Sequence, residues 1–279
     1  MKELPSLLKI SNLSLGYGER CIFSGINAAE DEGVLIALLG SNGRGKSTLL
    51  RTLAGLEEIW NGQENTRENG NTRECICNQG LLLYDGKPLD GYTRKEASAL
   101  VSFVSPLTDR TRYLSVKDMV SINSYWRTNW IGTSNTDEEE RVEEALKMVG
   151  LDGFAGRDCT SLSDGEYQRA TIAGALVQDS RIILLDEPTA FLDIANKFLV
   201  TRLLKKIAHK EGSKKLIIFS THDLQLALQI CDRLWVMTSE GFFSGTPSQM
   251  VEDGKLERMF DLEGMRFDKY KMTFVPKEK

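Results

Sequence analysis

The feature that most constrains this chain is a glycine-rich loop that directly follows a short, continuous apolar run. The loop is Gly40 to Thr48 (GSNGRGKST) and the run is Val34 to Leu39. The loop fits the pattern G-x-x-x-x-G-K-[ST], in which a strand enters a phosphate-binding turn and a helix leaves it. A strand that is apolar at every position is typical of a parallel sheet buried on both faces. We therefore expect an α/β protein built around such a sheet.

The residue types in this loop suit a nucleoside triphosphate. Glycines let successive backbone N–H groups turn toward phosphate oxygens, and the helix that follows adds its positive N-terminal end. Lys46 is predicted to place its charge on the β- and γ-phosphates, and the Ser47 hydroxyl to ligate Mg²⁺. The residues of the loop predicted to contact ATP are Gly40, Asn42, Gly43, Gly45, Lys46, Ser47 and Thr48.

Two carboxylates end a second apolar strand. Ile182 to Leu185 run directly into Asp186 and Glu187. Ligand sites in open α/β sheets lie beyond the carboxyl ends of the strands. Asp186 is predicted to hold Mg²⁺, directly or through its water, and Glu187 to orient and polarise the attacking water. The alternative is an acidic pair that only caps the next helix.

A histidine ends a third apolar strand, Leu216 to Phe219, which runs into Ser220-Thr221-His222. A lone histidine is usually structural. If this strand lies beside the one that carries Asp186, however, His222 faces the γ-phosphate. Lys46, Glu187 and His222 are therefore the predicted catalytic residues.

A second anion-binding turn is predicted at Leu162 to Arg169 (LSDGEYQR). Ser163 and Glu166 have capping-box spacing, so this turn could be only a good helix start. A helix start with Ser163 and Gly165 is also a ready anion site. Because Lys46 already belongs to a complete phosphate cradle, a second cradle without a lysine makes sense if it closes over another subunit's ATP.

The rest of the chain divides by pattern. Leu7 to Gly18, followed by Cys21 to Phe23, alternates like paired strands. Glu57 to Gly80 is polar and is interpreted as a surface hairpin or loop. Ser115 to Val177 is helical in pattern and interrupts the strand–helix alternation, as an inserted subdomain would. We expect a β subdomain and loop part (1–105), a helical subdomain (106–178), a second core part (179–245) and a C-terminal extension (246–279).

Another helix is expected between the second and third apolar strands. Its predicted apolar face is Ala195, Leu199, Leu203 and Ile207, at i, i+4 spacing.

Composition excludes several classes of protein. The 279 residues carry a net charge of −5 and no dense Lys/Arg tract, so nucleic acid is not an expected partner. The apolar runs are far shorter than a membrane span of about 20 residues. Met1 to Pro5 lack the apolar core of a secretion signal, so a cytoplasmic location is expected. The five cysteines are scattered, which argues against a disulfide framework, and Cys75 and Cys77 have no histidine nearby to complete a metal site.

These motifs, in this order, resemble an ATP-binding cassette (ABC) ATPase subunit from about Leu8 to Gly245. The resemblance implies a P-loop NTPase (RecA-like) core with an N-terminal antiparallel β subdomain and an inserted α-helical subdomain. For the nucleotide, it implies that Tyr17 stacks on adenine and that Gly40 to Thr48 form the Walker A loop. For catalysis, it implies that Asp186 and Glu187 are the Walker B aspartate and catalytic glutamate and that His222 is the switch histidine. For the dimer, it implies that Ser163 to Gly165 lie in the signature motif and that Asp193 is the D-loop aspartate at the interface. Read from the residues alone, Tyr17 could also be a core aromatic.

The chain departs from the family's pattern twice. The signature usually reads L-S-G-G-Q, and here Asp164 and Glu166 replace a glycine and the glutamine. These carboxylates either weaken closure over ATP by repulsion or strengthen the helix cap. The Q-loop glutamine, expected after the strand Val101 to Val104, is missing, because no glutamine occurs between Gln79 and Gln168. Ser105, Thr108 and Asp109 are the candidates to replace it.

The resemblance implies an importer ATPase. Tyr125 to Gly132 (YWRTNWIG) and Gly245-Thr246-Pro247 resemble the branch that serves iron–siderophore, haem and cobalamin uptake, although the Gly-Arg-x-Pro run often found there is absent. The implied partners are a second copy in a head-to-tail dimer, permease subunits that place the chain on the inner face of the membrane, and indirectly a substrate-binding protein. The alternatives are an exporter ATPase, an ABC protein that acts on ribosomes or DNA, and a monomeric P-loop kinase or GTPase.

Overall fold

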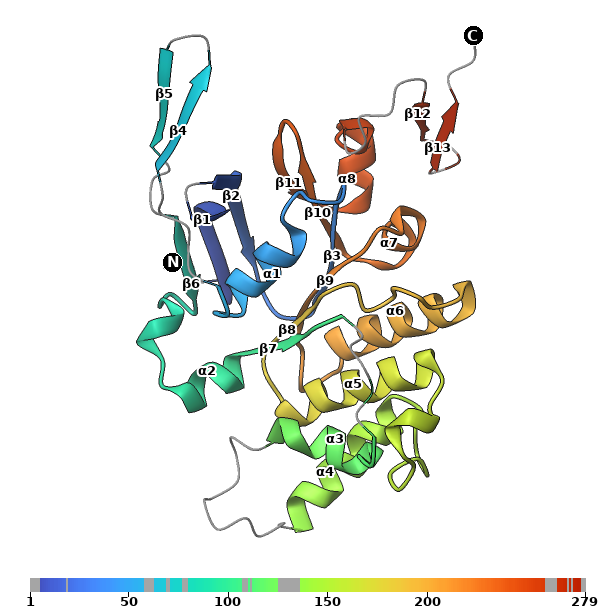
Figure 1. The fold of residues 1–279 in the computed structure, drawn as a ribbon. Helices are drawn as coiled ribbons and strands as arrows, with labels where there is room; N and C mark the ends of the chain where they lie inside the picture. Colours follow the sequence, from blue (N-terminus) through green and yellow to red (C-terminus); the bar gives the residue numbers. More distant parts are fainter. Residues whose placement is uncertain are drawn as a thin grey trace.

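The protein is described in a computed structural model (Figure 1), which covers residues 6–18, 20–57, 63–68, 71–76, 80–106, 110, 112–124, 136–258, 265–269, 271 and 273–276. The strands are β1 (Leu8–Tyr17), β2 (Arg20–Glu30), β3 (Val34–Gly40), β4 (Gln63–Glu68), β5 (Asn71–Ile76), β6 (Leu81–Tyr84), β7 (Val101–Val104), β8 (Ile182–Leu185), β9 (Leu216–Ser220), β10 (Arg233–Thr238), β11 (Gly241–Gly245), β12 (Met265–Asp268) and β13 (Thr273–Pro276). The α-helices are α1 (Lys46–Leu53), α2 (Arg94–Leu100), α3 (Val116–Ser121), α4 (Thr136–Met148), α5 (Asp164–Gln178), α6 (Ile194–Ala208), α7 (Leu224–Ile230) and α8 (Pro247–Glu252).

A six-stranded sheet forms the centre of the fold, with the strand order β11-β10-β3-β9-β8-β7. Its neighbouring strands run parallel, except that β11 pairs antiparallel with β10. Parallel strands end at the same edge of a sheet. Three adjacent strands, β3, β9 and β8, therefore deliver Gly40, Ser220 and Asp186 to one edge, as the sequence predicts.

The side chains of β3 show that this sheet is buried on both faces. Leu35, Ala37 and Leu39 belong to a core shared with helices α3 to α7, whereas Ile36 and Leu38 belong to a core shared with α1 and the N-terminal strands. All five side chains are fully buried. An uninterrupted apolar run is what a strand between two such layers requires. The helix after the phosphate loop and the long helix α5 thus lie on opposite faces of the sheet (Figure 1).

The N-terminal strands form a separate antiparallel sheet with the order β2-β1-β6. Its inner face contributes Leu8, Leu13 and Ile26, all fully buried, to the same core as α1. Together with helices α3 to α5, which are inserted between β7 and β8, this confirms the predicted fold class: an α/β core of the P-loop type with an antiparallel β subdomain and an inserted α-helical subdomain.

The predicted apolar face of helix α6 is confirmed near its C-terminal end and wrong near its N-terminal end. Ile207 is buried and Leu203 packs against the core, whereas Ala195 is exposed and Leu199 is 55% exposed. The other buried side chains of this helix are Val200, Thr201, Leu204 and Ala208. Because neighbouring residues are about 100° apart on a helix, two adjacent stripes can both show i, i+4 spacing. In this helix the stripe that contains Val200 packs against the core.

Two hairpins extend from the core. The polar segment after α1 forms the hairpin β4–β5, one of the two structures predicted for it. Near the C-terminus, β12 pairs with β13, and Phe267 is buried with its ring 5.3 Å from that of Phe274. The residues of several predictions lie outside the described part of the chain, namely Met1 to Pro5, Cys77, Thr108, Asp109 and Tyr125 to Gly132.

Candidate nucleotide site

The loop between β3 and α1 holds a buried cation at its centre. Gly43 and Gly45 have φ angles of 77° and 94°, a region that favours glycine, and a Cβ at Gly45 would lie 2.9 Å from Ile22 Cγ2. Lys46 is only 6% exposed, and its Nζ donates to the carbonyl oxygens of Gly40 at 2.9 Å and Ser41 at 3.3 Å. The loop thus folds over its lysine, as a phosphate cradle would.

The charge of Lys46 is balanced by two nearby carboxylates. Burial lowers the pKa of the lysine, while the negative charges of Glu187 and Asp186 oppose that effect. A compact cation facing acids at the end of β8, two strands away in the sheet, is the charge distribution that a phosphate and metal site requires.

Asp186 lies at the centre of a hydrogen-bonded set that joins the ends of β8 and β9 to the start of α1. It is 3% exposed, and its Oδ1 accepts from Ser47 Oγ at 3.1 Å and from Ser220 Oγ at 2.7 Å. The Ser220 hydroxyl also accepts from the backbone N–H of Glu187 at 2.8 Å. Ser220 is fully buried and links both carboxylate positions to β9. No role is predicted for Ser220 from the sequence, because a serine at a strand end carries no signal of its own.

Glu187 occupies a backbone conformation that is rare for a residue with a side chain. Its φ is 48°, and such positions cost on the order of 1–3 kcal/mol unless the surroundings hold them. Here the bond from its N–H to Ser220 holds the backbone, and the His222 Nε2 lies 2.9 Å from the Glu187 Oε1. The structure therefore brings together Lys46, Ser47, Asp186, Glu187 and His222, the five residues predicted for catalysis and metal binding.

The remaining predicted residues of this group lie around α1. The Tyr17 hydroxyl is 3.4 Å from Thr48 Oγ1 and donates to Glu57 Oε1 at 3.5 Å. Tyr17 is 49% exposed, so the interpretation of this residue as a core aromatic is wrong. Asn42 is exposed at the tip of the loop.

The second predicted cradle is a capped helix start. Ser163 is the N-cap of α5, its Oγ accepts from the Glu166 N–H at 3.3 Å, and the Glu166 carboxylate accepts from the Ser163 N–H at 2.7 Å. These bonds lower the pKa of Glu166. Within the described residues, no hydrogen bond or ion pair joins this turn to the group around Asp186. The turn is thus a separate site in the single chain.

The turn at Ser163 to Gly165, called the signature turn below, packs closely against the start of α6. Asp193 is the N-cap of α6, and its carboxylate accepts from the Asn196 N–H at 2.7 Å and from Asn196 Nδ2 at 3.2 Å. A Cβ on Gly165 would lie 2.8 Å from Asn196 Oδ1, so only glycine fits this contact without movement. The structure therefore places Ser163, Gly165 and Asp193 in one neighbourhood.

A recess of about 570 Å³ lies beside Glu187 and His222, and the C-terminal hairpin contributes to it. Glu187 and His222 line this recess, and so do Thr273 and Phe274 of β13. The sequence predicts only an extension for residues 246–279, because no motif marks the hairpin within it. The hairpin thus lies closer to Glu187 and His222 than its place in the sequence suggests.

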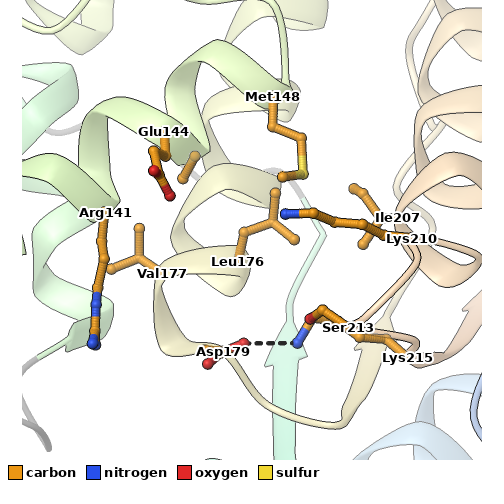
Figure 2. Close-up of a pocket in the computed structure, with 11 residues that line it drawn as sticks. Arg141, Glu144, Met148, Leu176, Val177, Asp179, Ile207, Lys210, Ser213 and Lys215 are labelled. Atoms are coloured by element: carbon orange, nitrogen blue, oxygen red, sulfur yellow. Dashed lines mark hydrogen bonds and ion pairs between the residues drawn. The ribbon is translucent and has the colours of Figure 1, made fainter.

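A second cavity, of about 240 Å³, lies apart from all these residues (Figure 2). It sits between α4, the end of α5 and the end of α6, where Lys215 donates to Asp179 at 3.0 Å. None of the residues predicted to bind ATP lines it. This cavity is therefore separate from the predicted nucleotide site at the end of β3.

The fold and the bonded group at the strand ends define a P-loop protein that binds and hydrolyses nucleotide. The family model of the ABC transporter matches residues 23–190, and the chain belongs to that family. It is an ATPase, an ATP-binding component of an ABC transporter. None of the described helices has the length and apolar character that a membrane span needs.

Two curated relatives and one solved structure are similar to this chain. The achromobactin transport ATP-binding protein CbrD of Dickeya dadantii is 30% identical over 90% of this chain and 86% of the relative. The petrobactin import ATP-binding protein FpuC of Bacillus anthracis is 30% identical over 97% of this chain and 93% of the relative. A structure described as a metal-chelate type ABC transporter in an inward-facing conformation aligns with a TM-score of 0.75, at 27% identity over 98% of both chains.

Proposed function

We propose that this chain energises an importer of an iron–siderophore, haem or cobalamin-type metal chelate, with two copies closing head to tail over ATP. The observation that carries the catalytic part is the bonded set in which Asp186 accepts from Ser47 and Ser220 while Glu187 reaches His222. The substrate class is supported by the names of two relatives, which describe achromobactin transport and petrobactin import.

The residues present fit a magnesium ion with its nucleotide. Ser47 Oγ and Asp186 Oδ1, 3.1 Å apart, are hard oxygen donors of the kind that Mg²⁺ prefers. The described residues contain no group of three or more His, Cys, Asp or Glu side chains that could cage a metal. Mg²⁺ is usually held by one or two protein oxygens plus substrate phosphates, so such a cage is not needed. When bound, the ion neutralises charge on the phosphate oxygens.

Within one copy, the chain's own residues divide the work of hydrolysis. Lys46 would release its loop carbonyls and donate to the phosphates, because its ammonium already lies inside the cradle. Glu187 would orient and polarise the attacking water, and His222 would hold the Glu187 carboxylate and contact the γ-phosphate. Tyr17, with its exposed ring beside α1, would stack on the adenine.

The second wall of each nucleotide site would come from the partner copy. Helices α1 and α5 pack on opposite faces of the core sheet, so Lys46 and Ser163 are carried by different layers of one chain. The helix start at Ser163 is an anion site without a nucleotide of its own. A head-to-tail pair would place Ser163 and Gly165 of each copy over the other's ATP, with Asp193 at the seam.

The chain's partners follow from this arrangement. A permease would carry the substrate and hold the ATPase at the inner face of the membrane, and a substrate-binding protein would deliver the chelate. The chain would then divide into a part that binds nucleotide (1–105), a part that contacts the partner copy (106–178) and a part that completes the core (179–245). The C-terminal extension (246–279) would follow them. An exporter ATPase is the second candidate, since the nucleotide site is the same for both directions.

Isolation of the native complex tests the proposed substrate and direction. We expect an affinity tag on this chain to recover a multi-span permease in mild detergent. ATP hydrolysis by that complex, reconstituted in vesicles, should rise when a binding protein loaded with iron chelate is added on the outer side. A complex carrying Lys46→Ala is the control for background hydrolysis. Recovery without a membrane partner, or stimulation only by a substrate on the ATPase side, would contradict the importer.

A further inference from the structure

An arginine from the segment between β7 and α3 reaches the signature turn. The Arg110 guanidinium donates through Nη1 to the Leu162 carbonyl oxygen and through Nη2 to the Asp164 carboxylate. It also lies over the Tyr167 ring, 5.2 Å from the ring centre. The Arg110 side chain is 24% exposed. These contacts hold the Arg110 cation against Leu162, against Asp164, the first residue of α5, and against Tyr167 in the first turn of that helix.

The same turn carries two carboxylates where the family's pattern has none. Glu166 is engaged in the capping box with Ser163. The Asp164 side chain is 60% exposed and pairs with Arg110. Without the arginine, the Asp164 carboxylate would compete with an incoming triphosphate for the positive N-terminal end of α5.

The backbone donors of the turn remain available. The N–H groups of Asp164 and Gly165 occupy the first two positions of α5, where no intrahelical partner exists. In the described part of the chain, no other group accepts from them. A triphosphate from a partner copy can use these donors only if the neighbouring carboxylate charge is neutralised.

We infer that Arg110 is a positioning residue that neutralises Asp164 and fixes the signature turn for the partner's ATP. This inference rests on the proposed two-copy site. It joins the two departures from the family's pattern: the segment that lacks the glutamine supplies the arginine, and the altered signature supplies its carboxylate. Of the two effects predicted for Asp164, repulsion and capping, the ion pair removes the first.

A single variant and a double variant of the full chain test this role. Arg110→Ala should raise the ATP concentration for half-maximal hydrolysis about fivefold, the size of effect that a partly exposed charge pair exerts, with the maximal rate changed less than twofold. Adding Asp164→Asn to Arg110→Ala should restore half-saturation to within about twofold of the unchanged chain, because the repelling charge is gone. Arg110→Lys, which keeps the charge but loses the fork, should fall between, and it serves if Arg110→Ala does not fold.

Arg157→Ala is the matched control. Its guanidinium contacts the Ser161 carbonyl at 3.1 Å and the Phe154 ring at 4.5 Å, so it borders the same turn without an ion pair to Asp164. We expect half-saturation within about twofold of the unchanged chain. Unchanged kinetics in Arg110→Ala would overturn the inference, as would a double variant as impaired as the single one. Failure of the Glu187→Gln chain to dimerise with ATP would instead count against the two-copy site itself.

Discussion

Glu187→Gln is expected to bind ATP normally, to hydrolyse it at least about a hundredfold more slowly, and to accumulate as an ATP-bound dimer. Removal of a positioned general base typically costs a factor of 10² to 10⁴. Glutamine keeps the shape of the side chain at a position where the backbone φ is 48° and the N–H is bonded to Ser220. The change therefore removes the carboxylate without disturbing its support.

Phosphate release and size-exclusion chromatography measure the two halves of this result. Glu32→Gln is a suitable control, because Glu32 pairs with Arg181 on the surface, away from the nucleotide loop. The control should hydrolyse ATP at the original rate and show no trapped dimer. Unimpaired hydrolysis by Glu187→Gln would remove the catalytic role from this residue.

Lys46→Ala is expected to weaken ATP binding on the order of a hundredfold and to abolish measurable turnover. Hydrogen bonds to charged groups contribute about 1.5–3 kcal/mol each, and the Lys46 ammonium would exchange two loop carbonyls for phosphate oxygens. Its removal also leaves the charges of Asp186 and Glu187 unopposed where a triphosphate must enter.

Titration with a fluorescent ATP analogue measures this loss. Lys9→Ala removes an exposed lysine from β1 and provides the control. A thermal melt should show both variants folded. Tight binding by Lys46→Ala would place the triphosphate somewhere other than this loop.

The parts of the site that the sequence predicted are those that local chain geometry dictates. Gly43, Gly45 and Lys46 form a continuous loop whose backbone must turn in one way, and Asp186 is fixed by the apolar strand just before it. Once three strands are parallel neighbours, their ends must meet. The group around Asp186 then follows from the order of the strands, apart from Ser220, for which no role is predicted.

The parts that the sequence could not predict depend on contacts between distant segments. Arg110 meets Asp164 only because the chain after β7 passes beside α5, and no pattern in either segment shows that pairing. Phe274 reaches the recess beside His222 through a hairpin that carries no motif. On α6, i, i+4 spacing fitted both the exposed stripe of Leu199 and the buried stripe of Val200, and only packing distinguishes them.

The most direct measurement of the shared nucleotide site mixes two differently disabled chains, both in the Glu187→Gln background. One carries Lys46→Ala and the other Ser163→Arg, each with its own fluorophore. A head-to-tail pair of unlike chains keeps one complete site, whereas like pairs keep none. The account predicts ATP-dependent energy transfer in the mixture and no ATP-dependent association in either chain alone. Absence of transfer in the mixture, or self-association of the Ser163→Arg chain, would contradict it.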